Sequence, residues 1–416
     1  MNIAKYSVGM GDRFGQEAVS QLRAVQKAES GGVVVIPVWN KSFREHTLVG
    51  TTPDEVRLAA DAAVRASGWR HAYHVDADHV GLKTVDAFLA SSDFFTLDVA
   101  DAIGKPAPDA DVASFVRDMS PFRGVLRMPE VDVAIDVTDA ALDAFARRYL
   151  VAVGEAGRTY RRIAASKGDG QFITEISVDE ASDPQSALEL FLLLGALARE
   201  RVAVQTVAPK FTGKFLKGVD YVGDAAAFAR EFDADLAVVR HAVGVFGLPP
   251  TLKLSVHTGS DKFTLYPIIR RALRRHDAGV HLKTAGTTWL EEVAGIALSG
   301  PAGLDVARRI ALAAYARVDE LCAPYATVVE IDRARLPAVD EVRGWTGAEL
   351  VERLRNDAAC PAYNVHFRQL LHVAFKVAAE MGDDFRRVLV ASREATGALV
   401  TDNLFGRHIE PLFLGR

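Results

Sequence analysis

Residues 73–81, YHVDADHVG, place ionisable side chains on alternate positions of a short apolar stretch. His74, Asp76 and Asp78 alternate with apolar or aromatic neighbours, and His79 follows directly. Because successive side chains of a β-strand point to opposite faces, the first three of these residues share one face of a predicted strand. On an edge strand that face would meet water, whereas in a closed barrel it would line a site. The organisation of the remaining chain decides between these two interpretations.

Predicted strands alternate with predicted helices along most of the chain, which indicates βαβ units and a parallel sheet. The predicted strands are residues 3–9, 33–39, 72–78, 94–100, 172–178, 202–208, 251–257 and 280–286. The helices predicted between them are residues 16–28, 53–67, 184–200, 224–243 and 262–276. This strand count predicts an α/β fold of the (β/α)8 TIM-type barrel class.

Two segments of the chain have no counterpart in a minimal (β/α)8 barrel. Between the fourth and fifth strands, residues 101–171 form a predicted helical insertion, with a long loop at 105–115 and a helix at 138–168. After the eighth strand, residues 301–416 are predicted to form a helical C-terminal extension packed on a catalytic barrel domain of residues 1–300. A doubly wound open sheet is the alternative fold, but no predicted strand is followed by a dinucleotide fingerprint at its proper spacing.

The composition is that of an ordinary soluble globular protein, with 49% hydrophobic residues, 25% charged residues and a formal net charge of -5 in 416 residues. This mild acidity gives no electrostatic reason to expect nucleic acid or an anionic membrane as a partner. The two cysteines are too few for a disulfide framework or a thiolate metal cluster. The N-terminus lacks an apolar run of signal-peptide length, and the longest apolar run, residues 188–198, is too short to span a bilayer. We therefore expect a cytoplasmic protein, and its oligomeric state stays open, a homo-oligomer included.

Several predicted strands carry polar side chains on the face opposite their apolar one. The polar positions predicted to face inward are His74, Asp76, Asp78, Asp98, Glu175, Ser177, Asp179, Gln205, Lys253, Ser255, His257, His281 and Lys283. One such strand would be an edge strand, but several together predict a polar barrel interior. In TIM-type barrels the active site lies at the C-terminal ends of the strands, so we expect the site there.

Carboxylates and imidazoles that converge from different strands are ligands typical of Zn, Mn, Co or Ni. The predicted metal set is Asp78, His257 and His281, with Glu175 close by. Such an ion would polarise a carbonyl group and stabilise an enediolate. For any one of these histidines alone, a packing role in the core is the simpler interpretation, and only their shared inward position favours a metal.

Lys283 and Lys253, which also point inward, have more than one interpretation. A lysine in a barrel can form a Schiff base with a ketone or donate a proton, and it can equally form an ion pair with Glu175 or an aspartate. In the C-terminal region, His366 and His372 are six residues apart, which is a poor spacing for one helix face. We therefore predict packing or rim roles for these two histidines.

Basic residues follow the second predicted strand in the stretch WNKSFREHT, residues 39–47, which is predicted to be a loop at the barrel mouth. The predicted substrate-binding residues are Lys41, Arg44 and His46 in this loop, and Lys210 after the sixth strand. Arginine and lysine at these positions would bind a carboxylate or phosphate of the substrate. A solvated charged loop without a ligand is the alternative.

Long blocks of the chain resemble the tagaturonate epimerase family. The blocks are KYSVGMGDRFG (5–15), PVWNKSFREHTLVGTTPDEVR (37–57), VDADHVGLKTVDAFLASSDFFTLDVAD (75–101), SVHTGSDKFTLYPII (255–269), HLKTAGTTWLEE (281–292) and NLFGRHIEPLF (403–413). The resemblance implies a metal-dependent barrel enzyme, an isomerase that interconverts D-tagaturonate and D-fructuronate. Members of this family are also associated with 4-epimerisation of the free ketohexoses D-tagatose and D-fructose.

The resemblance carries Asp78, His257 and His281 over as the metal set, because these residues lie in the matching blocks. The small-molecule substrate that it implies is a sugar or sugar acid. The chain is shorter than the resemblance leads us to expect, mainly between the fourth and fifth strands. Any lid or substrate loop that relatives carry there is therefore not implied for this chain.

The implied reaction inverts a carbon that is β to the ketone, so its C–H bond is not acidic. A retro-aldol cleavage reaches this carbon: a base takes the hydroxyl proton, the C–C bond breaks to an aldehyde and an enediolate, and the aldehyde turns over before the bond re-forms. We expect Glu175 and Asp76 as acid and base, with Lys283 as an electrostatic partner. Transient oxidation by a nicotinamide is the other route. A metal-dependent aldolase on a keto sugar acid and a non-catalytic sugar-binding barrel are the alternative functions.

Overall fold

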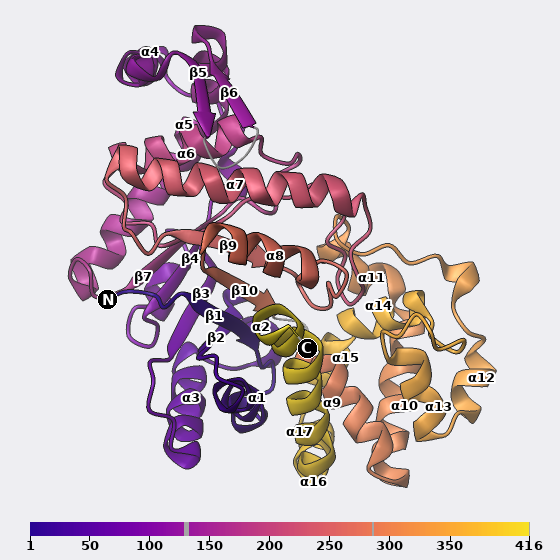
Figure 1. Cartoon of the computed structure of the whole chain (residues 1–416). Coiled ribbons are helices and arrows are strands. Elements are labelled where there is room, and N and C mark those ends of the chain that lie inside the picture. Colours follow the sequence, from indigo (N-terminus) through magenta and orange to yellow (C-terminus); the bar gives the residue numbers. More distant parts are fainter. Residues whose placement is uncertain (129–132, 285–286, 416) are drawn as a thin grey trace.

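The core of the molecule is a closed barrel of parallel strands, in the order β1-β10-β9-β8-β7-β4-β3-β2 (Figure 1). The structure is a computed structural model that describes residues 1–128, 133–284 and 287–415. The barrel strands are β1 (Tyr6–Gly11), β2 (Ile36–Ser42), β3 (His74–Val80), β4 (Phe94–Asp98), β7 (Ile173–Ser177), β8 (Thr206–Ala208), β9 (Lys253–His257) and β10 (Val280–Thr284). Each lies within or beside a predicted strand, so the predicted (β/α)8 barrel is confirmed. The last two residues of the predicted strand 280–286 lie outside the described residues.

The alternation of side chains in the strands separates an apolar outer layer from a polar interior. In β9 and β10, Leu254, Val256 and Leu282 are fully buried in the apolar layer between barrel and helices. His257 and Lys283 directly follow Val256 and Leu282, lie next to each other in the strand register and point into the barrel. The opening stretch YHVDADHVG forms β3 in the same way, between β2 and β4, so its polar face lines the barrel interior.

The helices that surround the strands and extend beyond them are α1 (Ala18–Ser30), α2 (Phe43–Val49), α3 (Pro53–Ser67), α4 (Asp109–Met119), α5 (Asp139–Lys167), α6 (Ala187–Arg199), α7 (Ala225–Phe246), α8 (Tyr266–His276), α9 (Thr287–Leu298), α10 (Pro301–Ala316), α11 (Val318–Cys322), α12 (Val339–Gly344), α13 (Gly347–Leu354), α14 (Val365–Val373), α15 (Phe375–Glu380), α16 (Asp383–Ala391) and α17 (Arg393–Asp402). The predicted helices between the strands are all present. Among the described residues, no helix combines the length and hydropathy needed to cross a bilayer.

The segment after β2 corrects the prediction of a loop at residues 39–47. The strand continues to Ser42, and α2 begins at the next residue. Ser42 and Glu45 form a capping box, in which each side chain accepts a hydrogen bond from the backbone N–H of the other. The S-x-x-E spacing is a helix-start signal, and it explains why a charged stretch forms a helix here.

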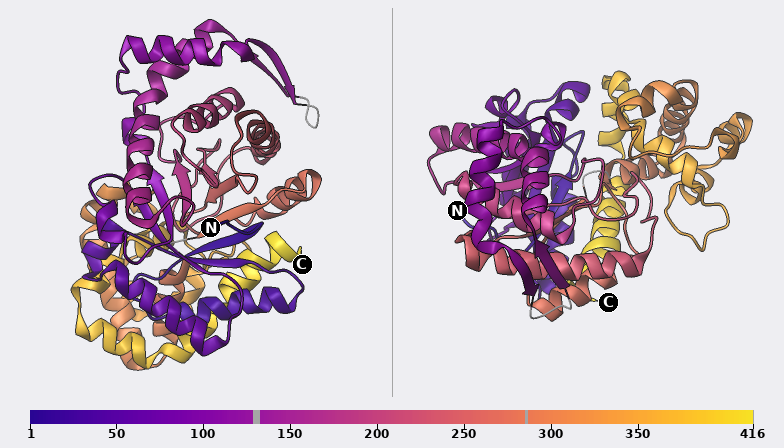
Figure 2. Two further views of the ribbon diagram at one scale, coloured as in Figure 1. Left: turned by 90° about the vertical axis from the view of Figure 1, so that its left-hand side faces the viewer. Right: turned by 90° about the horizontal axis from the view of Figure 1, so that it is seen from above.

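The insertion after β4 also differs from its prediction, because α4 begins at Asp109 inside the predicted loop 105–115. Its buried residues, Val112, Phe115 and Met119, have the three- and four-residue spacing of one helix face. An antiparallel hairpin of β5 (Gly124–Met128) and β6 (Val133–Val137) follows, and α5 leads back to the barrel. Figures 1 and 2 show α4 and the hairpin extending away from the barrel strands.

The C-terminal region is helical, as predicted, and α10 to α15 lie together on one side of the barrel (Figure 1). Its buried apolar residues form a cluster of their own, from Trp289 to Leu389. The chain then returns to the barrel through the π-helix η6 (Asn403–Leu414), whose buried apolar residues belong to the barrel cluster. The Tyr266 hydroxyl, on α8, lies 2.5 Å from Nδ1 of His408, on η6. The end of the chain therefore covers the barrel beside α8.

A buried ion pair joins the helical region to the loop after β9. The Arg368 guanidinium lies 2.6 Å from Oδ2 of Asp261, and both side chains are at most 1% exposed. Asn356 donates to the same carboxylate at 3.0 Å, and His408 lies 3.5 Å from its other oxygen. Nearby, the Lys262 ammonium donates to four backbone carbonyl groups. This network fixes the loop that directly follows His257.

Candidate functional site

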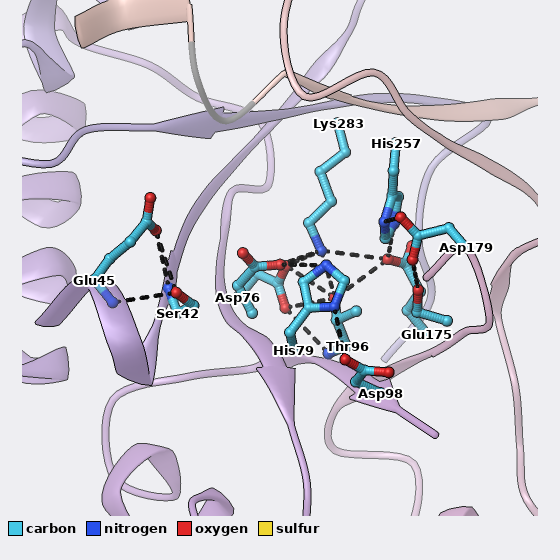
Figure 3. Close-up of polar contacts among 12 residues, drawn as sticks. Ser42, Glu45, Asp76, His79, Thr96, Asp98, Glu175, Asp179, His257 and Lys283 are labelled. Carbon is cyan, nitrogen blue, oxygen red and sulfur yellow. Dashed lines mark hydrogen bonds and ion pairs between the residues drawn. The ribbon is translucent and has the colours of Figure 1, made fainter. Parts of the chain in front are cut away.

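Lys283, on β10, lies at the centre of a group of buried carboxylates inside the barrel (Figure 3). Its ammonium nitrogen lies 2.8 Å from Oδ2 of Asp76, 2.7 Å from Oδ1 of Asp78 and 3.3 Å from Oε1 of Glu175. It also donates to the Thr96 hydroxyl at 2.7 Å. The three residues predicted to be catalytic, Asp76, Glu175 and Lys283, are therefore in direct contact.

The proton distribution in this group follows from one ammonium among three carboxylates. Burial disfavours the charged lysine, but the carboxylates outweigh it and hold the pKa of Lys283 well above its usual range. Burial, with Asp78 and Glu175 adding to it, outweighs the ammonium and raises the pKa of Asp76 to about 7. For Glu175 burial is outweighed by Lys283 and His257, which hold its pKa well below the usual range. Lys283 is thus an ion-paired cation in this structure, whereas a Schiff base would require its neutral amine.

A second group lies beside the first, toward the ends of the strands. His79, Asp179 and His257 each offer one ligand atom, and these atoms lie within 4.8 Å of one another. Nδ1 of His257 is 3.2 Å from Oδ2 of Asp179. All three side chains are partly exposed, unlike the fully buried Glu175. Figure 3 shows them converging from three different strand ends.

Each histidine of this group has a carboxylate near both of its ring nitrogens, and Nε2 of His79 lies 3.7 Å from Oδ1 of Asp78. Nε2 of His257 is 2.7 Å from Oε1 of Glu175, and Nδ1 of His79 is 3.3 Å from Oδ2 of Asp98. Asp78, followed by Asp98 and Asp179, outweighs burial and raises the pKa of His79 to about 10. Asp179, followed by Glu175, outweighs burial and raises the pKa of His257 to about 9. Histidines that bind metals typically donate their second ring N–H to such a carboxylate. Two nitrogens and one carboxylate oxygen are also a donor set typical of a catalytic divalent metal.

His79 and Asp179 were absent from the predicted metal set. His79 follows Asp78 and should therefore point to the opposite face, but its backbone is left-handed, with φ of 51°. The register between β3 and β4 shifts at the same place, between Ala77 and Val80. Strict alternation could not reveal this turn. For Asp179 a signal existed, because it continues the alternate positions of Glu175 past the end of β7.

Of the predicted metal set, His257 alone belongs to this group. Asp78 reaches the Lys283 ammonium instead. His281 is fully buried two residues before Lys283, with Nδ1 at 2.9 Å from the Ser7 hydroxyl and its ring 5.3 Å from that of Phe94. Burial lowers the pKa of His281 to about 3, so its imidazole is neutral.

Two of the predicted substrate-binding residues have their polar atoms engaged with Thr51. The buried Lys41 ammonium donates to the Thr51 hydroxyl and to the backbone carbonyl of Arg13, both at 2.7 Å. Nδ1 of the buried His46 lies 3.0 Å from the same hydroxyl. These contacts fix α2 against the barrel.

The other two predicted substrate-binding residues lie on opposite sides of the mouth. Arg44 is exposed on α2, and its guanidinium lies 5.0 Å from the centre of the Tyr325 ring, which belongs to the helical region. Lys210 follows β8, and its ammonium donates to the backbone carbonyl of Ala181. Arg44 therefore lies beside a residue of the helical region.

Comparison with known proteins places the chain among sugar-acid epimerases. The model of the tagaturonate epimerase family matches residues 1–412. A protein named tagaturonate/fructuronate epimerase, from Thermotoga maritima, is 28% identical over 383 residues, which are 89% of this chain and 72% of that protein.

Crystal structures of the fructuronate-tagaturonate epimerase UxaE from Cohnella laeviribosi have a similar fold. The complex with two glycerols has a TM-score of 0.78 at 25% identity, covering 99% of this chain and 83% of that chain. The native structure has a TM-score of 0.75 at 25% identity, covering 98% and 82%. The match of the family model along almost the entire chain shows that this protein belongs to the tagaturonate epimerase family of carbohydrate epimerases, which are isomerases.

Proposed function

We propose that this protein interconverts D-tagaturonate and D-fructuronate and that it uses a divalent metal ion. The names of the Thermotoga maritima and Cohnella laeviribosi relatives support the substrate pair. The observation that carries the proposal is the juxtaposition of two polar groups at the barrel mouth. The group of His79, Asp179 and His257 can hold a cation, and the adjoining ammonium of Lys283 is surrounded by carboxylates.

The donor set fits a divalent ion such as Zn, Mn, Co or Ni. His79, Asp179 and His257 would be the ligands, and three protein ligands leave positions for substrate oxygens. Asp98 and Glu175 would orient the two imidazoles from behind. When bound, the ion would act as a Lewis acid on the substrate carbonyl group.

The inverted carbon is β to the ketone, which favours retro-aldol cleavage over deprotonation. A base removes the proton of the hydroxyl group on this carbon, and the bond to the α-carbon breaks. The products are an aldehyde and an enediolate, which keeps the electron pair. After the aldehyde has presented its other face, the bond re-forms and the new alkoxide takes the proton back. Every atom is retained, so no oxidant or reductant is needed.

The carboxylates around Lys283 supply the proton transfers that this route needs. Asp76, with its pKa near 7, can hold or release a proton at neutral pH. Lys283 lies between Asp76 and Asp78, and its fixed positive charge stabilises negative charge that develops on the substrate. Glu175 stays ionised, holds His257 at 2.7 Å and keeps Lys283 charged.

The test is a turnover assay with metal-stripped protein. The protein is treated with chelator, re-supplied separately with Zn, Mn, Co or Ni, and incubated with D-tagaturonate and, in parallel, with D-tagatose. Chromatography then resolves the epimers and any three-carbon fragments. We expect fructuronate only after a metal is returned, and loss of this activity in Asp179→Asn. Asp183→Asn is the matched control, because Asp183 is exposed and pairs with Arg148. Full turnover after chelation would contradict the metal, and no epimer under any condition would contradict the function.

A further inference from the structure

Positive charge gathers where the helical region meets the mouth of the barrel. Arg13 lies two residues after the end of β1, and its Nε lies 3.0 Å from Oε1 of Glu45. Its guanidinium carbon is 4.2 Å from the centre of the Phe375 ring, on α15. Arg13 is 6% exposed, and within the part of the chain that the structure describes its Nη1 has no hydrogen-bond partner. The site of this cation is therefore built from both parts of the protein.

Lys217, in the segment between β8 and α7, adds a second cation from the barrel side. Its backbone N–H donates to the carbonyl of Val328 at 2.8 Å, which ties the segment to the helical region. Its ammonium lies 5.3 Å from the centre of the Tyr325 ring. Arg44 lies 5.0 Å from the centre of the same ring, so two cations share one aromatic partner.

His372, on α14, is a buried polar side chain beside the segment that carries Lys217. It is 1% exposed, and neither of its ring nitrogens has a hydrogen-bond partner among the described residues. It packs against Gly218, the neighbour of Lys217, because a Cβ added there would lie 3.3 Å from its own Cβ. Burial and then the charges of Arg13 and Lys217 hold the pKa of His372 well below its usual range, so the imidazole is neutral. Buried polar groups are nearly always hydrogen-bonded, so the ring nitrogens of His372 are available to a polar ligand.

The local charge balance favours an anion as that ligand. The charged side chains that act on Lys217 are Arg13 and Arg44, which lower its pKa together with burial, and Glu45 and Glu180, which raise it. Three cations thus face two carboxylates. Glu180 directly follows Asp179, so this cluster begins where the candidate metal group ends.

We propose that Arg13, Lys217 and His372 bind the carboxylate of the hexuronate substrate. This inference rests on the proposed function and extends it, because the helical region then supplies part of the substrate site. The carboxylate is the substrate's one ionised group and lies at the end of the sugar remote from the ketone. A ketohexose carries a hydroxymethyl group there, which brings no negative charge to Lys217 or to Nη1 of Arg13. The cluster therefore selects sugar acids over neutral sugars.

The test compares Lys217→Met with Lys214→Met, a control in the same segment whose ammonium pairs with Glu330 at the surface. Removal of a charged hydrogen-bond partner should raise the KM for D-tagaturonate about 10- to 100-fold in Lys217→Met, with kcat little changed. His372→Leu should raise the same KM about 10-fold, whereas Lys214→Met should stay within about twofold of the wild type. A role in holding the helical region alone would instead lower the unfolding temperature of Lys217→Met and leave its KM unchanged.

A binding measurement separates this inference from the proposed reaction. The melting temperature is recorded with D-galactonate, a sugar acid that lacks the ketone, and with the neutral galactitol. We expect galactonate to raise the melting temperature of the wild type and of Lys214→Met but not of Lys217→Met, and galactitol to raise none of them. A wild-type KM and undiminished galactonate binding in Lys217→Met would overturn the carboxylate site. Selective galactonate binding without turnover of tagaturonate would overturn the proposed reaction and leave this site standing.

Discussion

Replacement of Lys283 by methionine removes the one ammonium that holds three buried carboxylates. The side chains of Asp76 and Glu175 are fully buried, and that of Asp78 is 9% exposed, so none of them gains much solvation from water. Loss of one partner from a buried ion pair costs about 3–5 kcal/mol of unfolding free energy, because a charge is left without compensation. Asp76, with a pKa of about 7, takes up a proton and limits its own share of this cost. We therefore expect Lys283→Met to lose about 3 kcal/mol of unfolding free energy, the lower end of this range, because Glu175 keeps His257 at 2.7 Å and Asp78 keeps His79 at 3.7 Å.

Urea denaturation followed by circular dichroism measures this loss, with Lys253→Met as the matched control. The Lys253 ammonium is buried lower in the barrel, where it donates to the carbonyl of Lys5 and the hydroxyl of Ser7, and burial lowers its pKa to about 7. Its replacement removes hydrogen bonds and should lower the unfolding free energy by about 1–3 kcal/mol. Among the described residues, Lys253 forms no ion pair with a carboxylate, so no such pair is lost.

A double variant tests the cause of the loss. Adding Asp78→Asn to Lys283→Met removes one of the carboxylate charges that lose the ammonium. The double variant should regain ~2 kcal/mol of unfolding free energy relative to Lys283→Met. Lys283→Met should also lower kcat about 10²- to 10³-fold, as expected when a fixed cation beside a developing negative charge is lost. An unfolding free energy of Lys283→Met within about 1 kcal/mol of the wild type, or no lower than that of Lys253→Met, would show that the ammonium does not stabilise these carboxylates.

Three further outcomes follow. Asp98→Asn removes the carboxylate behind a candidate metal ligand and should weaken zinc binding about 10- to 100-fold in a calorimetric titration, and unchanged affinity would speak against that role. Gly9→Ala should lower kcat/KM about tenfold, because a Cβ there would lie 3.0 Å from Cγ of Lys283. Gly81→Ala should match the wild type, because among the described residues no packing neighbour lies within 4 Å of a Cβ at that position. Arg368→Met should cost about 3–5 kcal/mol at pH 7 by urea denaturation. In the folded wild type, Arg368 outweighs burial and lowers the pKa of its partner Asp261. The difference in unfolding free energy between wild type and Arg368→Met should therefore persist down to about pH 4 and shrink below it. An unchanged difference at pH 3 would contradict the pairing.

The barrel could be predicted from the sequence because strands alternate with helices and several of the strands have a two-residue polarity pattern. Residues such as Asp76, Glu175 and Lys283 were predicted to face inward from this pattern, and the structure brings them into contact. Their grouping needed only the rule that parallel strands of a barrel converge at one end. The charged helix α2 was missed because its capping signal, Ser42 and Glu45, is short compared with the charge that surrounds it.

Other features depend on tertiary structure that no local pattern contains. His79 joins Asp179 because a left-handed backbone turns it away from the face that alternation assigns to it. His372 was predicted to have a packing or rim role, since its relation to Arg13 and Lys217 arises only when the helical region packs on the barrel. These three residues lie more than 150 positions apart in the chain, so their proximity depends on the complete fold.

We propose that His79, Asp179 and His257 bind the metal that is used in catalysis. Anomalous diffraction from crystals of the active, zinc-loaded protein tests it most directly. We expect a zinc peak at about 2.0–2.2 Å from one ring nitrogen of His79, from one of His257 and from a carboxylate oxygen of Asp179. A peak between Asp78 and His281 instead, or no peak in crystals of protein that is fully active, would contradict it.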